Sequence, residues 1–278
     1  MITLIKKNKC FDGFVEYYEH DSFSTQTQMK FSVFVPANNK KSPVLFWLSG
    51  LTCTEENFMA KAGVQQFANR EGIIIVCPDT SPRGTNIKGE HDHWDFGSGA
   101  GFYVNATTEL WKQNYRMYDY IVNELPELIA SNFSADLLRL SIFGHSMGGH
   151  GALTIALRNP KMFKSVSALA PICAPMQCAW GQKAFTHYLG KDSNDWTNYD
   201  ASELIKLAQI HVPILIDQGT DDEFLKEQLK TSVFENICKT AKYNVNIRFQ
   251  KGYDHSFYFI SSFIEDHINF HAKYLYGN

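Results

Sequence analysis

The chain has 278 residues, of which 44% are hydrophobic and 20% charged, an ordinary composition for a globular protein. The formal net charge is -3, and no basic run carries interleaved aromatic residues, so neither nucleic acid nor a membrane surface is an expected partner. The first residues lack the apolar core of a signal peptide, and no run approaches the roughly 20 apolar residues of a membrane span, so we expect a cytosolic location.

Apolar periodicity predicts alternating strands and helices along the chain. Strands are predicted at residues 11–20, 29–36, 44–48, 72–77, 138–143, 165–170, 212–217 and 244–249. Helices are predicted at residues 55–69, 105–131 (with a possible kink at Pro126), 151–158, 181–190, 224–241 and 256–274. The first two strands look like an antiparallel edge. Residues 80–104 are irregular, and loops of that length in a compact domain are often functional.

This alternation predicts an α/β fold with a mostly parallel central sheet and helices on both faces. We find no internal repeat, low-complexity stretch or linker, so residues 1–278 are expected to form a single domain. In such sheets the chemistry lies at the carboxyl ends of the strands. Ser146, the pair Asp221 and Asp222, and His255 each follow a predicted strand, so the topology places them at one edge.

Six cysteines are scattered along the chain, and none of them is spaced as a zinc ligand or a redox pair. A disulfide framework is not expected in a chain of this size without a secretion signal. We therefore expect no metal site, and expect most of these side chains to be small buried hydrophobes. Cys53 is the exception, because of its place beside a predicted site.

Residues 144–148 fit the pattern G-x-S-x-G, with a strand pattern before them and a helix pattern after them. A serine on such a turn sits in a strained backbone, and the flanking glycines let the strand and the helix pass close together. The alternative is a glycine-rich turn that happens to hold a serine. The strand and helix context favours a nucleophile elbow at Ser146.

A serine nucleophile needs a base and an orienting carboxylate, and α/β-hydrolases place them in the chain order Ser, acid, His. His255 follows the predicted strand 244–249 and fits that order. Asp221 and Asp222 both follow the strand 212–217, and we expect one to orient His255 while the other caps the next helix or faces solvent. Spacing alone does not choose between them. The competing histidines lie too close to Ser146, before it, or inside the last helix: His91, His93, His145, His150, His267 and His271.

An oxyanion hole needs two backbone N–H groups, one of which belongs to the residue after the nucleophile, here Met147. The other comes from the loop after an early strand, for which residues 49–54 are the candidate and Leu51 the expected donor. The alternative is an ordinary turn in which Thr54 caps the next helix. If this loop lines the site, Cys53 lies close to it. Modification of Cys53 would then block entry, which makes it a candidate sensor.

Several sequence blocks, in order and over nearly the whole chain, resemble those of the S-formylglutathione hydrolase (esterase D) family of α/β-hydrolases. These blocks are residues 49–54 with 57–58, 78–84, 144–152, 180–185, 216–219 with 222–225, and 252–256. The resemblance implies hydrolysis of S-formylglutathione to formate and glutathione, as part of glutathione-dependent formaldehyde detoxification. It also implies a cytosolic homodimer that needs no cofactor.

Carried over by position, the family's nucleophile falls on Ser146, its base on His255 and its acid on Asp222. The chain departs from the family at Ala179, where a proline is expected directly before Trp180. This change concerns the loop near the acyl pocket and leaves the three catalytic positions untouched.

A formyl group is small, so the acyl pocket should be narrow, and Trp180 and Phe96 are candidate walls. The two carboxylates of glutathione call for cations. Those in predicted loops are Arg83, Lys88 and Lys183. The alternatives are ordinary packing for the two aromatic residues and solvated surface charges for the three cations.

Three functions stay open at this point. The first is the thioesterase, which works through a formyl-enzyme intermediate. The second is a general short-chain carboxylesterase that uses the same three residues on oxygen esters. The third is a non-catalytic receptor with the same fold, against which the complete set of Ser146, Asp222 and His255 argues.

Overall fold

A computed structural model describes residues 1–37 and 40–277, and the described residues build one nine-stranded sheet. Its strand order is β1-β2-β3-β5-β4-β6-β7-β8-β9. The strands are β1 Ile2–Cys10, β2 Gly13–Asp21, β3 Gln28–Val35, β4 Ser42–Leu48, β5 Ile74–Pro78, β6 Ala135–His145, β7 Phe163–Leu169, β8 Ile214–Gly219 and β9 Asn246–Gln250.

The sheet has an antiparallel edge and a parallel remainder. Strands β1, β2 and β3 pair antiparallel, and β3 joins β5 antiparallel. The remaining pairs, from β5 through β4, β6, β7 and β8 to β9, are all parallel. In the parallel part, Leu48 is opposite Gly144, His145 opposite Leu169, and Leu169 opposite Asp217. The carboxyl ends of β4, β6, β7 and β8 therefore lie at one level, as the strand pattern predicted. Strand β1 is an additional edge strand.

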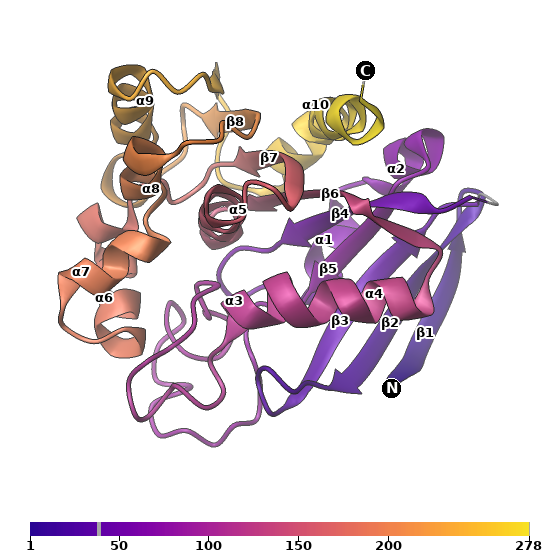
Figure 1. Cartoon of the computed structure of the whole chain (residues 1–278), viewed down its shortest axis with the longest axis horizontal. Helices are drawn as coiled ribbons and strands as arrows, with labels where there is room; N and C mark the ends of the chain where they lie inside the picture. The colour runs from indigo at the N-terminus through magenta and orange to yellow at the C-terminus, as the bar shows by residue number, and fades with distance from the viewer. Residues whose placement is uncertain (38–39, 278) are drawn as a thin grey trace.

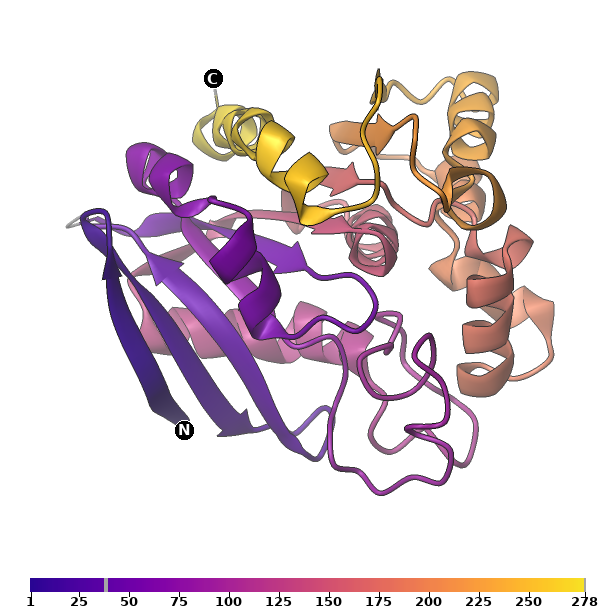
Figure 2. The same cartoon turned by 180° about the vertical axis from the view of Figure 1, so that it is seen from behind.

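Helices cover both faces of this sheet (Figure 1). Helices α4 and α5 pack on one face, and Figure 2 shows α1, α2 and α10 on the other. The helices are α1 Glu55–Lys61, α2 Gln65–Glu71, α3 Met117–Asp119, α4 Leu125–Asn132, α5 Met147–Arg158, α6 Ala179–Tyr188, α7 Ser193–Trp196, α8 Ala201–Leu207, α9 Thr231–Thr240 and α10 Phe257–Tyr276. None of the helices in the described ranges has both the length and the apolarity that crossing a bilayer requires.

Two of the predicted helices are interrupted. The helix predicted at 55–69 is two helices, because the chain turns at Gly63 with φ of 69°. The helix predicted at 224–241 begins as a π turn at Leu225–Leu229 and restarts as α9 after Lys230, which has φ of 57°. A single left-handed residue is enough to end a run of helical hydrogen bonds.

The helix predicted at 105–131 begins only at Met117. Before it, the N–H groups of Thr107 and Thr108 donate to the carbonyl oxygen of Tyr188 at the end of α6. These donors are satisfied by a distant segment, so the local helical pattern is overridden. Pro126 lies just after a π turn at Tyr120–Glu124, inside a run that is helical from Met117 to Asn132, so the helix is irregular next to the proline.

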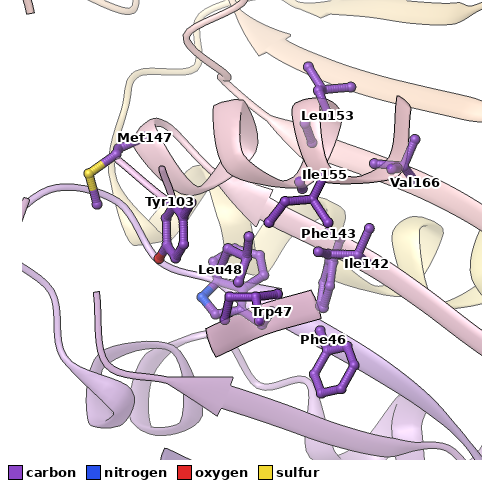
Figure 3. Packing of buried hydrophobic residues seen from close by; sticks show 14 of the residues in the cluster. Phe46, Trp47, Leu48, Tyr103, Ile142, Phe143, Met147, Leu153, Ile155 and Val166 are labelled. Carbon is purple, nitrogen blue, oxygen red and sulfur yellow. The ribbon is translucent and has the colours of Figure 1, made fainter. Parts of the chain in front are cut away.

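The core beneath the elbow packs aromatic side chains among aliphatic ones (Figure 3). Trp47 of β4 stacks on Phe58 at 3.7 Å between ring centroids and meets the edge of Phe143 at 4.7 Å. Tyr103 from the long loop packs against Gly151 of α5, where a Cβ would lie 2.5 Å from the tyrosine ring. The long loop is thereby anchored beneath the helix that follows the elbow.

A buried polar network joins α10 to β7 and β8. Asp217 of β8 accepts hydrogen bonds from Arg248 Nε at 2.7 Å and Gln250 Nε2 at 2.8 Å, and it lies 3.0 Å from His267 Nε2. His267 Nδ1 lies 2.7 Å from Ser167 Oγ in β7. Burial raises the pKa of Asp217, but the hydrogen bonds from His267 and Arg248 outweigh it and bring that pKa to about 2.

We predict that Asp217→Asn lowers the free energy of unfolding by about 2–4 kcal/mol, because Arg248 loses its buried carboxylate partner. The pKa of Asp217 lies below its ordinary value of 3.8, so its stabilisation is present above about pH 4 and is lost as the pH falls toward 2. Urea unfolding should therefore show the gap between wild type and variant closing by about 2 kcal/mol between pH 5 and pH 2.

Asp266→Asn is the matched control, since Asp266 contacts the same arginine at 2.7 Å but its side chain is 51% exposed. We expect it to change the free energy of unfolding by less than about 1 kcal/mol. Equal effects of the two substitutions would contradict the role assigned to the buried network.

Candidate active site

Ser146 occupies a strained turn between β6 and α5. Its φ of 57° and ψ of -120° lie outside the regions that a residue with a side chain ordinarily adopts. Such a conformation costs on the order of 1–3 kcal/mol and persists only where the surroundings enforce it. A Cβ at Gly148 would lie 1.9 Å from Leu48 O, and one at Gly144 would lie 2.3 Å from Gly148 O. Both glycines of the pattern are therefore required by close backbone packing.

Hydrogen bonds hold the backbone of the turn on both sides. The Ser146 N–H donates to Leu169 O at 3.1 Å, and its carbonyl accepts from His150 N at 3.0 Å and from Ile172 N at 3.2 Å. Strand β7 and the segment after it thus fix the turn from one side while α5 fixes it from the other. The Ser146 side chain is carried at the carboxyl edge of the sheet, as the strand-to-helix context predicted.

Asp222 and His255 meet at the same edge. His255 Nδ1 lies 2.6 Å from Asp222 Oδ2, and the Asp222 side chain is fully buried. Asp222 also accepts hydrogen bonds from Gln218 Nε2 at 3.2 Å and from the N–H of Phe224 at 2.9 Å. One aspartate therefore both contacts the imidazole and caps the following turn, two roles that were predicted for separate neighbours. Asp221 is exposed and accepts from Thr220 Oγ1.

The imidazole of His255 is enclosed by two other rings. The ring of His145 lies 4.4 Å from it between centroids, tilted by 43°, and Phe224 presents its edge at 5.1 Å. Burial, together with the nearby His255, lowers the pKa of His145 far below its ordinary value, so its ring is neutral. Local spacing excluded His145 as the base, but only the tertiary structure reveals this contact with His255.

Ser146 and His255 open into one cavity of about 200 Å³. Residues from six separate segments line it: Gly50, Leu51, Cys53, Trp94, His145, Ser146, Trp180, Phe224, His255, Ser256 and Phe257. A larger cavity of about 450 Å³ lies at the amino ends of β8 and β9, but no serine or cysteine lines it. The smaller cavity therefore combines a serine and a histidine, the residue types that nucleophilic chemistry needs.

The aromatic wall of the cavity only partly matches the expectation. Trp180 lines it and packs edge to face against Trp94 at 5.5 Å between centroids. The expectation that Phe96 forms a wall is wrong, because that ring is buried against Trp111 and Tyr188. The irregular loop turns Trp94 into the cavity instead, and alternation along an irregular segment gives no signal for this.

The two backbone N–H groups predicted for an oxyanion hole belong to Leu51 and Met147. Leu51 lines the cavity, and Met147 begins α5 directly after Ser146. Neither the Leu51 N–H nor the Met147 N–H donates a hydrogen bond to any described residue. A Cβ at Gly50 would lie 3.1 Å from Ser146 Cβ, so the loop after β4 approaches the serine closely.

The loop that carries Leu51 combines both of its predicted roles. Thr54 caps α1, and its own N–H donates to Asn57 Oδ1 at 2.7 Å in return. Cys53 is half-buried and lines the cavity. Burial raises the pKa of the Cys53 thiol above its ordinary value, so little reactive thiolate is present at neutral pH. All six cysteines are free, and four of them are buried as expected.

Comparisons with known proteins agree with this geometry. A family model described as a putative esterase matches residues 22–270. An S-formylglutathione hydrolase from Bos taurus is 56% identical over 275 residues, covering 98% of each chain. One from Arabidopsis thaliana is 55% identical over 279 residues, covering 99% of this chain and 98% of its own.

A solved structure leads to the same family. An S-formylglutathione hydrolase from Agrobacterium tumefaciens matches with a TM-score of 0.95 and 46% identity, covering 98% of this chain and 99% of its own. The likeness to these relatives in fold and sequence thus extends over nearly the whole chain. The chain belongs to the S-formylglutathione hydrolase family of esterases and has the α/β-hydrolase fold.

Proposed function

We propose that this chain hydrolyses S-formylglutathione to formate and glutathione, with Ser146 as nucleophile, His255 as base and Asp222 as orienting acid. The observation that carries the proposal is the 2.6 Å contact between His255 and the buried Asp222, beside a strained serine. The substrate is supported by the relatives named above, which are 55% and 56% identical over nearly the whole chain.

In the proposed reaction, Ser146 Oγ attacks the formyl carbonyl carbon while His255 takes the hydroxyl proton. Asp222 fixes the imidazole tautomer and stabilises the imidazolium that forms. The N–H groups of Leu51 and Met147 stabilise the tetrahedral oxyanion, and one such donor is commonly worth about 100- to 1000-fold in rate. The C–S bond then breaks, and the departing glutathione sulfur takes the proton from His255. Water next attacks the formyl-enzyme with the neutral His255 as base, and formate leaves as Ser146 Oγ regains a proton from the imidazolium.

The leaving group suits this site. A thiol has a pKa of roughly 8.5, so its thiolate departs with less acid assistance than an alkoxide needs. The small cavity, with Trp94 and Trp180 in its wall, has room for a short acyl group beside Ser146. Oxygen esters of short acids would fit the same space, which keeps short-chain carboxylesterase activity as the competing function.

We further propose that residues 1–278 act as one domain, in a cytosolic homodimer that needs no cofactor. The single sheet from β1 to β9 supports the first point, since strands from both ends of the chain belong to it. The family resemblance and the six free cysteines support the cytosolic location. The dimer and the absence of a cofactor rest on the resemblance alone.

The substrate assignment is tested by kcat/KM for S-formylglutathione and for p-nitrophenyl acetate, on wild type and Ser146→Ala. We expect the thioester to be preferred by orders of magnitude, and the variant to lose activity on both substrates because it lacks the nucleophile. An oxygen ester that reacts equally well or better would favour the carboxylesterase. Residual wild-type-like activity in Ser146→Ala would contradict the mechanism.

The two adjacent aspartates offer a matched pair of variants. We predict that Asp222→Asn lowers kcat for S-formylglutathione by about 10³- to 10⁴-fold, because an amide cannot hold the productive tautomer of His255. Asp221→Asn should stay within about twofold of wild type, since Asp221 is exposed and does not contact the imidazole. Circular dichroism of both variants checks folding, and a larger loss in Asp221→Asn would reverse the assignment.

A further inference from the structure

The cavity beside Ser146 offers no charged group for the carboxylates of a glutathione thioester. Among the described residues that line it, none is a lysine, arginine, aspartate or glutamate. Carboxylates bind with useful strength where a cation donates charge-assisted hydrogen bonds to them. Any cation that selects a glutathione thioester over a neutral ester must therefore stand just outside the cavity wall.

The cations that the sequence suggested are engaged or lie elsewhere. Arg83 donates to both carboxylate oxygens of Asp79, at 2.7 and 2.8 Å. Lys183 Nζ lies 2.6 Å from Asp95 Oδ1. Lys88 lines a different cavity. Their charges are thus compensated or lie away from the serine.

Lys61 differs from all three. It is the last residue of α1, and its Nζ lies 5.2 Å from the centroid of the Phe257 ring, which lines the cavity. Within the described ranges no carboxylate oxygen lies at ion-pair distance from this ammonium group. Its positive charge also acts on the Cys53 thiol, another lining group, where it opposes the rise in pKa that burial causes.

An ammonium group on an aromatic face keeps its hydrogen-bond donors free for a ligand. Contact with Phe257 restricts the long side chain and so reduces the entropy that binding would otherwise cost. The charge is thereby held beside Phe257 of the cavity wall, without a carboxylate partner among the described residues. This is the arrangement expected of a group that captures an anionic part of the substrate.

We propose that Lys61 binds a carboxylate of the glutathione moiety and is a specificity-determining residue of this site. The inference rests on the proposed function, because a glutathione thioester is the substrate it explains. The competing role is structural: a lysine in the last turn of α1 also interacts favourably with the helix dipole. A structural role would change stability and would treat charged and neutral substrates alike.

The test compares kcat and KM for S-formylglutathione and p-nitrophenyl acetate in Lys61→Met, Lys61→Arg and Lys61→Glu. Methionine keeps an apolar stem over Phe257 and removes the charge. We expect Lys61→Met to raise KM for the thioester by about 3- to 10-fold with little change in its kcat, so that the thioester-to-ester ratio of kcat/KM falls by the same factor. Lys61→Glu should lower this ratio further, and Lys61→Arg, which keeps the positive charge, should leave the ratio near the wild-type value.

Lys112→Met is the control, since Lys112 is exposed, pairs with Glu109 and does not line the cavity. It should leave the specificity ratio unchanged. The salt dependence of KM for the thioester should weaken in Lys61→Met, because an exposed ion pair is screened by salt.

Inhibition of p-nitrophenyl acetate hydrolysis by S-methylglutathione measures carboxylate capture without thioester cleavage. We expect its inhibition constant to rise by about 3- to 10-fold in Lys61→Met. If wild type cleaves S-formylglutathione while Lys61→Met and Lys61→Glu match it in the ratio and in this constant, the inference on Lys61 is wrong and the proposed function stands. If wild type does not cleave the thioester, the proposed function fails, and the inhibition constants still decide the role of Lys61.

Discussion

The backbone of α5 meets the backbone of β4 with no room for a side chain between them. A Cβ at Gly148 would lie 1.9 Å from Leu48 O, which is far inside van der Waals contact. This close approach accompanies the strained conformation of Ser146, and the loop after β4 lies so near that a Cβ at Gly50 would be 3.1 Å from Ser146 Cβ. The placement of the proposed nucleophile and of the Leu51 donor therefore follows from one backbone contact.

The partners of Ser146 depend on a second set of contacts. Asp222 follows β8 and His255 precedes α10, so their 2.6 Å contact requires α10 to hold a fixed place against the sheet. Buried hydrogen bonds from His267 of α10 to Asp217 of β8 and Ser167 of β7 hold α10 in that place. Strand β8 and helix α10 thus carry the buried network that stabilises the fold, and they also place Asp222 and His255 in the site.

Short-range patterns predict much of this molecule. The parallel strands and the edge that holds Ser146 and His255 follow from apolar runs and turn residues a few positions apart. Spacing could not separate Asp221 from Asp222, because their difference lies in burial. It also missed the tilted contact of His145 with His255 and the approach of Lys61 to Phe257, which bring together segments distant in the chain. Residues 105–116 have a local helical pattern but are irregular. The N–H groups of Thr107 and Thr108 donate to Tyr188, which lies far along the chain, and no local pattern signals such a partner.

The strained turn and the Asp222–His255 pair should make Ser146 the single activated nucleophile of the chain. Covalent labelling by a fluorophosphonate, followed by mass spectrometry of the intact chain and its peptides, tests this. We expect one adduct per chain, located on Ser146 and absent from Ser146→Ala. A folded wild-type protein that stays unlabelled, or an adduct on another residue, would contradict it.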